Sequence, residues 1–118
     1  MMNNEQLELW KNLKEDNTLE EVQEYIRKVI EIRGFSNQSI EQAMLLLTEE
    51  IGELAKAIRK EKTTMSIDNN KIRNYDTIES EVADVFLVLC TICNKLNINL
   101  FSSLKDKEKK NIERIWKK

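Results

Sequence analysis

Apolar residues recur every three or four positions over most of the chain, which is the spacing of an amphipathic α-helix. In residues 18–34 this pattern follows Thr18 and Glu21, whose spacing is that of a Ser/Thr-x-x-Glu capping box, and it stops near Gly34. Upstream, residues 1–17 hold enough apolar side chains for a short amphipathic helix. The start of the chain is therefore predicted to form a short helix followed by a capped helix.

The next helix is expected to run from Ser36 or Ser39 to about Glu61. Its apolar side chains follow at alternating spacings of three and four residues and make one continuous stripe: Met44, Leu47, Ile51, Leu54 and Ile58. Gly52 interrupts this helix at a cost of about 1 kcal/mol. We interpret this glycine as the mark of a close approach by a partner helix or a ligand.

Residues 62–77 have no apolar rhythm and are predicted to form a long connecting loop, either a lid or a variable insertion. Residues 78–96 form the most apolar segment of the chain and are predicted to be helical. A last helix is expected over about 100–116, with Asn99 as its N-cap.

Composition favours an all-α fold. The chain has no proline and two glycines, whereas β-sandwiches and barrels need many turns rich in both. We predict a helical bundle of about four main helices plus the short N-terminal helix, with residues 1–17 as an N-terminal extension and residues 18–118 as one domain. A chain of 118 residues buries a small fraction of its surface, so association through apolar helices is expected.

The net charge and the positions of the cysteines indicate the cellular compartment and the classes of molecule that the protein binds. The formal net charge of −2 gives no field that would attract nucleic acid or an anionic membrane, and no apolar run indicates a membrane span or a leader. We expect a cytoplasmic protein that binds neither. Cys90 and Cys93 lie within the apolar helix and are interpreted as reduced core residues. The absence of histidine excludes Ser-His-Asp and Cys-His nucleophile systems.

Two helices each carry a pair of carboxylates one turn apart. Glu50 and Glu53 interrupt an apolar shoulder of the second long helix, and Glu81 and Asp84 repeat the same spacing in the third. Ten of the twelve residues in 82–93 are apolar, and an aspartate is almost never buried without a partner or a metal. Asp84 therefore requires a partner.

The two pairs allow two interpretations, a salt bridge to a buried lysine or arginine and a site for a divalent metal. Facing carboxylates without a counter-ion repel one another strongly at low dielectric, and hard oxygen ligands suit Mg²⁺ or Mn²⁺. We favour the metal site. Glu49 falls on another side of its helix and is expected to be solvated.

The C-terminal segment 105–118 is basic, with seven lysines and arginines against three acids. The spacing brings Lys107, Asn111 and Arg114 onto one face of the last helix, which is expected to bury Phe101, Leu104 and Ile115. A metal cluster beside a basic, amide-bearing helix suits a polyphosphate. The alternative is a solvated basic face.

The segments Glu49–Glu53 and Glu81–Asp84 resemble the Glu-Glu-x-x-Glu and Glu-x-x-Asp motifs of the MazG-like all-α nucleoside triphosphate pyrophosphohydrolases. Members of that family also carry a lysine, an asparagine and an arginine in the last helix, and Lys107, Asn111 and Arg114 stand at the matching distances here. The resemblance extends over about 18–116.

The resemblance implies Mg²⁺-dependent cleavage of an NTP or dNTP, with Mn²⁺ as an alternative metal, to the monophosphate and pyrophosphate, in nucleotide-pool house-cleaning. It implies homodimers or tetramers. It assigns metal binding and catalysis to Glu50, Glu53, Glu81 and Asp84, and substrate binding to Lys107, Asn111 and Arg114.

Base preference stays open, because the chain has no histidine and ends Arg114-Ile115-Trp116 where many relatives have Tyr-Pro. A phosphoribosyl-ATP pyrophosphatase-like or dUTPase-like enzyme and a non-catalytic helical assembly module are the alternatives.

Overall fold

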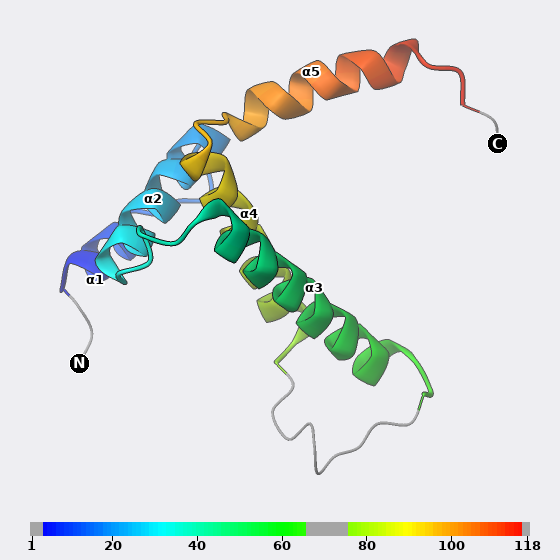
Figure 1. Cartoon of the computed structure of the whole chain (residues 1–118), viewed down its shortest axis with the longest axis horizontal. Coiled ribbons are helices and arrows are strands. Elements are labelled where there is room, and N and C mark those ends of the chain that lie inside the picture. Colours follow the sequence, from blue (N-terminus) through cyan, green and yellow to red (C-terminus); the bar gives the residue numbers. More distant parts are fainter. Residues whose placement is uncertain (1–3, 66–75, 117–118) are drawn as a thin grey trace. The chain divides into compact units, whose positions relative to one another are not determined.

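The computed structural model describes residues 4–65 and 76–116 of the 118-residue chain. These residues form five helices and no strand (Figure 1). In chain order the helices are α1 (Asn4–Lys11), α2 (Leu19–Ile32), α3 (Ile40–Lys62), α4 (Ile78–Lys95) and α5 (Leu100–Glu113). The predicted all-α fold is confirmed. Most of the predicted loop over 62–77 lies outside the described residues.

Side-chain caps fix where the helices begin. Thr18 accepts a hydrogen bond from the Glu21 N–H at 3.1 Å, and the Glu21 carboxylate accepts one from the Thr18 N–H at 2.7 Å. Ser39 and Gln42 repeat this arrangement at the start of α3, at 3.1 and 2.9 Å. Asn99 caps α5 as predicted. These side chains satisfy N–H groups that have no partner inside their helices.

Helices α2 and α4 each end at a residue with a left-handed backbone conformation. Gly34 has a φ of 84° and Asn97 a φ of 56°. In each case the following residue donates its N–H to a carbonyl of the last helical turn, at 3.0 Å after α2 and 2.8 Å after α4. This hydrogen bond is that of a Schellman motif, which explains why α2 stops at the predicted glycine.

Helix α5 ends at Glu113, three residues before the predicted end at Trp116. Arg114 is already extended, with φ −84° and ψ 149°. The carbonyl of Asn111, which would accept from Ile115 in a longer helix, instead accepts from the Arg114 N–H at 3.2 Å and from the Trp116 indole N–H at 3.0 Å. The tryptophan side chain therefore takes over a backbone acceptor of the helix.

The chain divides into two compact units. The first contains residues up to Asn37 and from Cys93 onward, and the second contains Gln38–Ile92. The first unit holds α1, α2, α5 and the end of α4, and the second holds α3 and most of α4. The predicted boundary between residues 17 and 18 stays a prediction.

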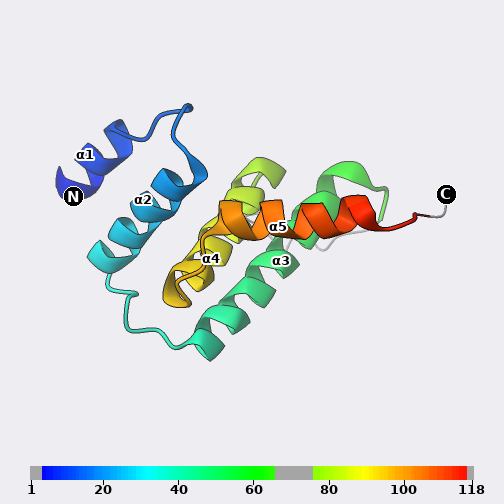
Figure 2. The same ribbon diagram turned by 90° about the horizontal axis from the view of Figure 1, so that it is seen from above.

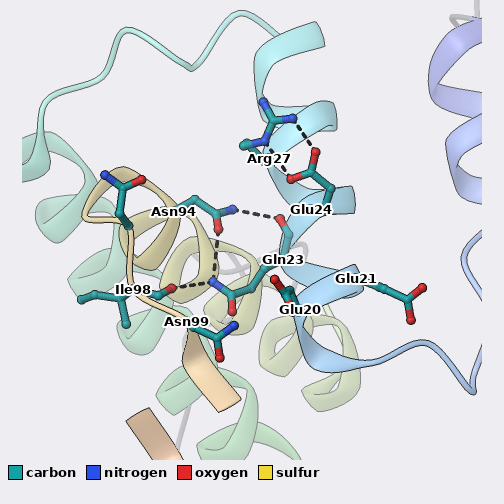
Figure 3. Close-up of a pocket in the computed structure, with 9 residues that line it drawn as sticks. Glu20, Glu21, Gln23, Glu24, Arg27, Asn94, Ile98 and Asn99 are labelled. Atoms are coloured by element: carbon teal, nitrogen blue, oxygen red, sulfur yellow. Dashed lines mark hydrogen bonds and ion pairs between the residues drawn. The ribbon is translucent and has the colours of Figure 1, made fainter. Parts of the chain in front are cut away.

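In the first unit, a buried glutamine joins α2 to the turn after α4 (Figure 3). The Gln23 amide donates to the Asn94 side chain at 3.2 Å and to the Ile98 carbonyl at 2.9 Å, and its oxygen accepts from the Leu100 N–H at 2.8 Å. All hydrogen-bonding groups of this side chain are used, which allows it to be buried. Ile26 and Val29 supply the apolar core on the same helix.

Helix α1 lies beside α2 in both views (Figures 1 and 2). The Arg33 guanidinium connects the two helices by donating to the Gln6 side chain at 2.9 Å. Helix α5 also contacts α2, but none of its residues is buried. The prediction that the last helix buries one apolar face is therefore wrong for the described chain. The three side chains of that face are 53–97% exposed: Phe101, Leu104 and Ile115.

In the second unit, α3 runs beside the first part of α4 (Figures 1 and 2). Its buried residues are Ala43 and Ala57. The predicted apolar stripe lies on a neighbouring face, and Met44, Ile51 and Ile58 remain 42–50% exposed. Two small side chains thus face the interior of this unit, while the longer apolar side chains are left partly in water.

Cys90 and Cys93 are buried free thiols. Among the residues described, no single helix is both long and apolar enough to cross a membrane, although α4 and α5 taken together as a bent pair have the required length and composition.

Gly52 does not mark a close approach in the described structure, because a Cβ built there meets no atom within 4 Å. Within the described chain, this glycine therefore has only its conformational cost in the middle of α3, and approach by a ligand or a second copy stays a prediction.

We predict that Gly52→Ala raises the free energy of unfolding by about 0.5 to 1 kcal/mol, because alanine restricts the unfolded chain and fits the helix. Thermal unfolding followed by circular dichroism measures this change. Gly34→Ala is the matched control and should destabilise the chain, since Gly34 has a positive φ. A loss of stability in Gly52→Ala would show that another molecule packs against this position.

Candidate metal centre

Three carboxylates from two helices meet in the second unit. Glu50 projects from the middle of α3, and Glu81 and Asp84 lie one turn apart near the start of α4. One oxygen of each side chain lies within 4.8 Å of an oxygen of each of the others. The sequence does not determine which helices pack together. In the structure, α3 and α4 bring members of both predicted carboxylate pairs together.

The cluster is largely shielded from water. Glu81 is 6% exposed, and Glu50 and Asp84 are half-buried. Within residues 4–65 and 76–116, none of the ion pairs includes any of these three side chains. A salt bridge to a described lysine or arginine, the first of the two sequence-based interpretations, is therefore not formed.

Burial and mutual repulsion raise the pKa of two of these carboxyl groups. For Glu50 the larger cause is desolvation, followed by the negative charges of Asp84 and Glu81. For Glu81 desolvation is again the first cause, and Asp84 and Asp76 add repulsion. Both effects oppose the charged form, so a cation placed among these groups would be strongly favoured.

Glu53 lies outside this cluster. Its carboxylate forms an ion pair with Lys56 at 3.5 Å, and both side chains are about half exposed. Its charge still raises the pKa of Glu50 and Glu81, so it lies within electrostatic range of both. The structure thus brings together three of the four predicted ligands and leaves the fourth one helical turn away on α3.

Two residues before α4 belong to the surroundings of the cluster and were not predicted. The Thr77 hydroxyl accepts a hydrogen bond from the Ser80 N–H at 3.1 Å and so caps the helix that carries Glu81. Asp76 adds negative charge next to Glu81. A threonine directly before an apolar helical segment is the signal that would have located this cap.

The donor set fits a hard divalent cation. All three side chains offer carboxylate oxygens, which are the ligands that Mg²⁺ and Mn²⁺ prefer, and no histidine is present to favour a softer metal. Substrate phosphates and water commonly complete the coordination of Mg²⁺.

The predicted substrate-binding residues belong to the first unit. Lys107 is exposed on α5, and the Asn111 amide donates to the Glu108 carboxylate at 2.6 Å. Arg114 follows the end of α5, so it does not share a helical face with the other two. Its guanidinium lies 4.5 Å from the centroid of the Trp116 ring. Their role in substrate binding stays a prediction.

Residues 38–116, about two thirds of the chain, match the family model of the MazG nucleotide pyrophosphohydrolase domain. This match covers the carboxylate cluster and the whole of α5. No curated protein and no solved structure shows a significant match. Membership implies nucleotide pyrophosphohydrolase activity in general, and the acidic cluster agrees with the metal dependence typical of such enzymes. The chain belongs to the MazG nucleotide pyrophosphohydrolase family.

Proposed function

We propose that this protein hydrolyses a nucleoside or deoxynucleoside triphosphate to the monophosphate and pyrophosphate in a reaction that requires Mg²⁺, or Mn²⁺ in its place. The observation that carries the proposal is the cluster of Glu50, Glu81 and Asp84, three carboxylate groups within 4.8 Å of one another. Since no described lysine or arginine pairs with them, a divalent cation is the counter-charge that this arrangement lacks.

Glu50, Glu81 and Asp84 would hold the metal, and we propose Glu53 as a fourth ligand. Its ion pair with Lys56 is exposed and therefore weak, so the carboxylate can exchange its partner at little cost. When bound, the cation supplies charge neutralisation at phosphate oxygens and activation of water. The carboxylates would fix its position, because they come from the middle of α3 and from the first two turns of α4 rather than from loops.

Lys107, Asn111 and Arg114 are proposed to bind the substrate. A triphosphate brings several negative charges to a site already rich in carboxylates, so cationic side chains must offset part of that charge. Lys107 and Arg114 have no ion pair with a described acid and are available for phosphate oxygens. Asn111 can contact a sugar or a base edge without adding charge.

In the proposed reaction, the oxygen of water forms a bond to the α-phosphorus. The bond from this phosphorus to the bridging oxygen breaks, pyrophosphate leaves, and one proton is released. We propose that the reaction takes place in the cytoplasm and removes unwanted nucleotides from the pool. Phosphoribosyl-ATP and dUTP belong in the substrate panel, because both are alternatives for a chain of this family.

Hydrolysis in ¹⁸O-labelled water tests this reaction. We predict that with Mg²⁺ the label appears in the monophosphate, because water attacks the α-phosphorus, and that chelation of the metal stops turnover. Mass spectrometry of the two products locates the label. Label in pyrophosphate, or nucleoside diphosphate as first product, would contradict the proposal.

The same assay tests the carboxylates. Asp84→Asn should lower kcat/KM by about a hundredfold or more, equivalent to about 2.7 kcal/mol of transition-state stabilisation, because the amide keeps the volume but loses the charge. Glu79→Gln is the matched control, since Glu79 is an exposed acid on the same helix outside the cluster. Equal activity of the two variants would mean that the ligands are misassigned.

We predict that Glu81→Gln stabilises the metal-free protein at neutral pH while weakening its response to Mg²⁺. Because the pKa of Glu81 is raised in the folded chain, ionisation costs stability as the pH rises from the ordinary glutamate value of 4.5 through the raised pKa. The gain from glutamine should therefore vanish in acid below that window. Melting temperatures across pH, with and without Mg²⁺, measure both effects. A glutamine variant less stable than wild type at neutral pH without metal would refute the account.

Alanine at Lys107 should reduce kcat/KM about tenfold or more, a loss of roughly 1.5 to 3 kcal/mol, because a contact between the ammonium group and phosphate is removed. The melting temperature should change little, since this side chain is exposed. Lys109→Ala, which alters another side of the same helix, should stay within about 0.5 kcal/mol of wild type. If both variants behave alike, α5 does not bind substrate through Lys107.

We further propose that the protein is a homo-oligomer, a dimer or a tetramer, in which a second copy covers the apolar stripe of α3. The stripe alternates spacings of three and four residues and is half exposed, as expected for a helix that packs against another helix.

Ile58→Glu should therefore shift the protein toward the monomer, because it places a charge within the stripe. Light scattering at micromolar concentration measures the mass. Leu45→Glu is the control, since Leu45 is 67% exposed and lies away from the stripe. A wild-type protein that is monomeric and fully active would contradict this proposal.

A further inference from the structure

The Trp116 side chain reaches back to the last turn of α5. The Trp116 indole N–H donates to the Asn111 carbonyl at 3.0 Å, and the Arg114 N–H donates to the same oxygen at 3.2 Å. The side chain of Asn111 is fixed as well, through its hydrogen bond to Glu108. The final turn is therefore held by three hydrogen bonds that converge on one residue.

An aromatic ring and a cation are in contact directly after α5. The Arg114 guanidinium carbon lies 4.5 Å from the centroid of the Trp116 ring, within the range of a cation–π interaction. In the described part of the chain, Arg114 forms no ion pair with an acid. A cation–π contact uses no N–H group of the guanidinium, so these donors stay available to an anion.

Such an arrangement suits phosphate binding. A guanidinium group can donate two parallel hydrogen bonds to phosphate, but a flexible arginine loses side-chain entropy when it does so. The tryptophan ring limits this loss by holding the guanidinium before the ligand arrives. The indole N–H bond to the helix end limits the motion of the ring in turn.

We propose that Trp116 is a positioning residue, which holds the Arg114 guanidinium ready for the phosphate groups of the substrate. This inference rests on the proposed function, because it assigns Arg114 to substrate binding in the same reaction. Trp116 acts through Arg114. Its loss should therefore weaken substrate binding more than it slows the chemical step.

Steady-state kinetics with a triphosphate that the wild type hydrolyses provides the first test. Trp116→Ala should raise KM about fivefold with kcat within about twofold, the effect expected when an exposed cation–π contact is lost. Trp116→Phe keeps a ring but lacks the indole N–H, and its KM should fall between that of the wild type and that of Trp116→Ala. Lys109→Ala is the control and should keep the wild-type KM.

A double-mutant cycle separates positioning from a structural role. Arg114→Gln should raise KM by at least as much as Trp116→Ala, and the double variant should be no worse than Arg114→Gln alone, because Trp116 has nothing left to position. Independent, additive effects of the two substitutions would contradict the proposal. So would a Trp116→Ala variant with a lowered melting temperature and an unchanged KM.

Tryptophan fluorescence gives a readout that does not depend on turnover. The chain has two tryptophans, so Trp10→Phe leaves Trp116 as the single emitter. Addition of inorganic pyrophosphate with Mg²⁺ should change the Trp116 emission, since the anion alters the contact between the guanidinium and the ring. Arg114→Gln in this background should abolish the change, and Lys109→Ala should preserve it. Pyrophosphate binding without any change in emission would overturn the proposal.

The outcomes distinguish this inference from the proposed function. If the wild type releases pyrophosphate from a triphosphate and Trp116→Ala has the wild-type KM, the positioning role is wrong and the function stands. If the wild type hydrolyses no triphosphate with either metal, the proposed function is wrong, and the role of Trp116 in it falls as well.

Discussion

Glu50, Glu81 and Asp84 place three like charges within 4.8 Å of one another, and no described cation pairs with them. The apolar surface of α4 makes the repulsion worse, because it removes the water that would otherwise screen it. A chain selected for stability alone would have apolar or amide side chains at these positions. We interpret the cluster as a binding site whose cost to the free protein is offset when a divalent cation enters. The proposed catalytic role, the expected metal dependence and the pH dependence of stability all depend on this constraint.

Local hydrogen bonds fix where the helices begin and end. Side-chain caps set the beginnings of α2, α3 and α5, and left-handed residues end α2 and α4. The amide of Gln23 then joins α2 to the turn between α4 and α5. Apolar burial contributes less, since the apolar stripe of α3 and the apolar side chains of α5 remain exposed in the described chain. This balance is consistent with the proposal that a second copy completes the core.

Features encoded by neighbouring residues were predictable from the sequence. The capping box at Thr18 and the stop at Gly34 follow from local hydrogen bonding, and the structure confirms them; of the two predicted starts of α3, Ser39 is the N-cap. Two carboxylate pairs could be recognised because acids are rare in apolar helices. Features in which different residues compete for the same partner were not predictable. Sequence spacing does not show which of several possible partners a residue contacts in the folded chain. For this reason the sequence did not predict that Ala43 and Ala57 are buried instead of the longer apolar stripe, or that Glu53 pairs with Lys56. It also did not predict that α5 ends early, at the Trp116 hydrogen bond.

Binding of Mn²⁺ to the purified protein, followed by electron paramagnetic resonance, tests whether the carboxylate cluster holds a divalent cation. The signal of free Mn²⁺ reports the bound fraction without any need for substrate or turnover. We expect saturable binding with at least one ion per chain, competition by Mg²⁺, and a strong loss of affinity in Glu81→Gln but not in Glu79→Gln. Binding that is absent in the wild type, or that is equal in all three proteins, would contradict the assignment of the carboxylate cluster as a metal site.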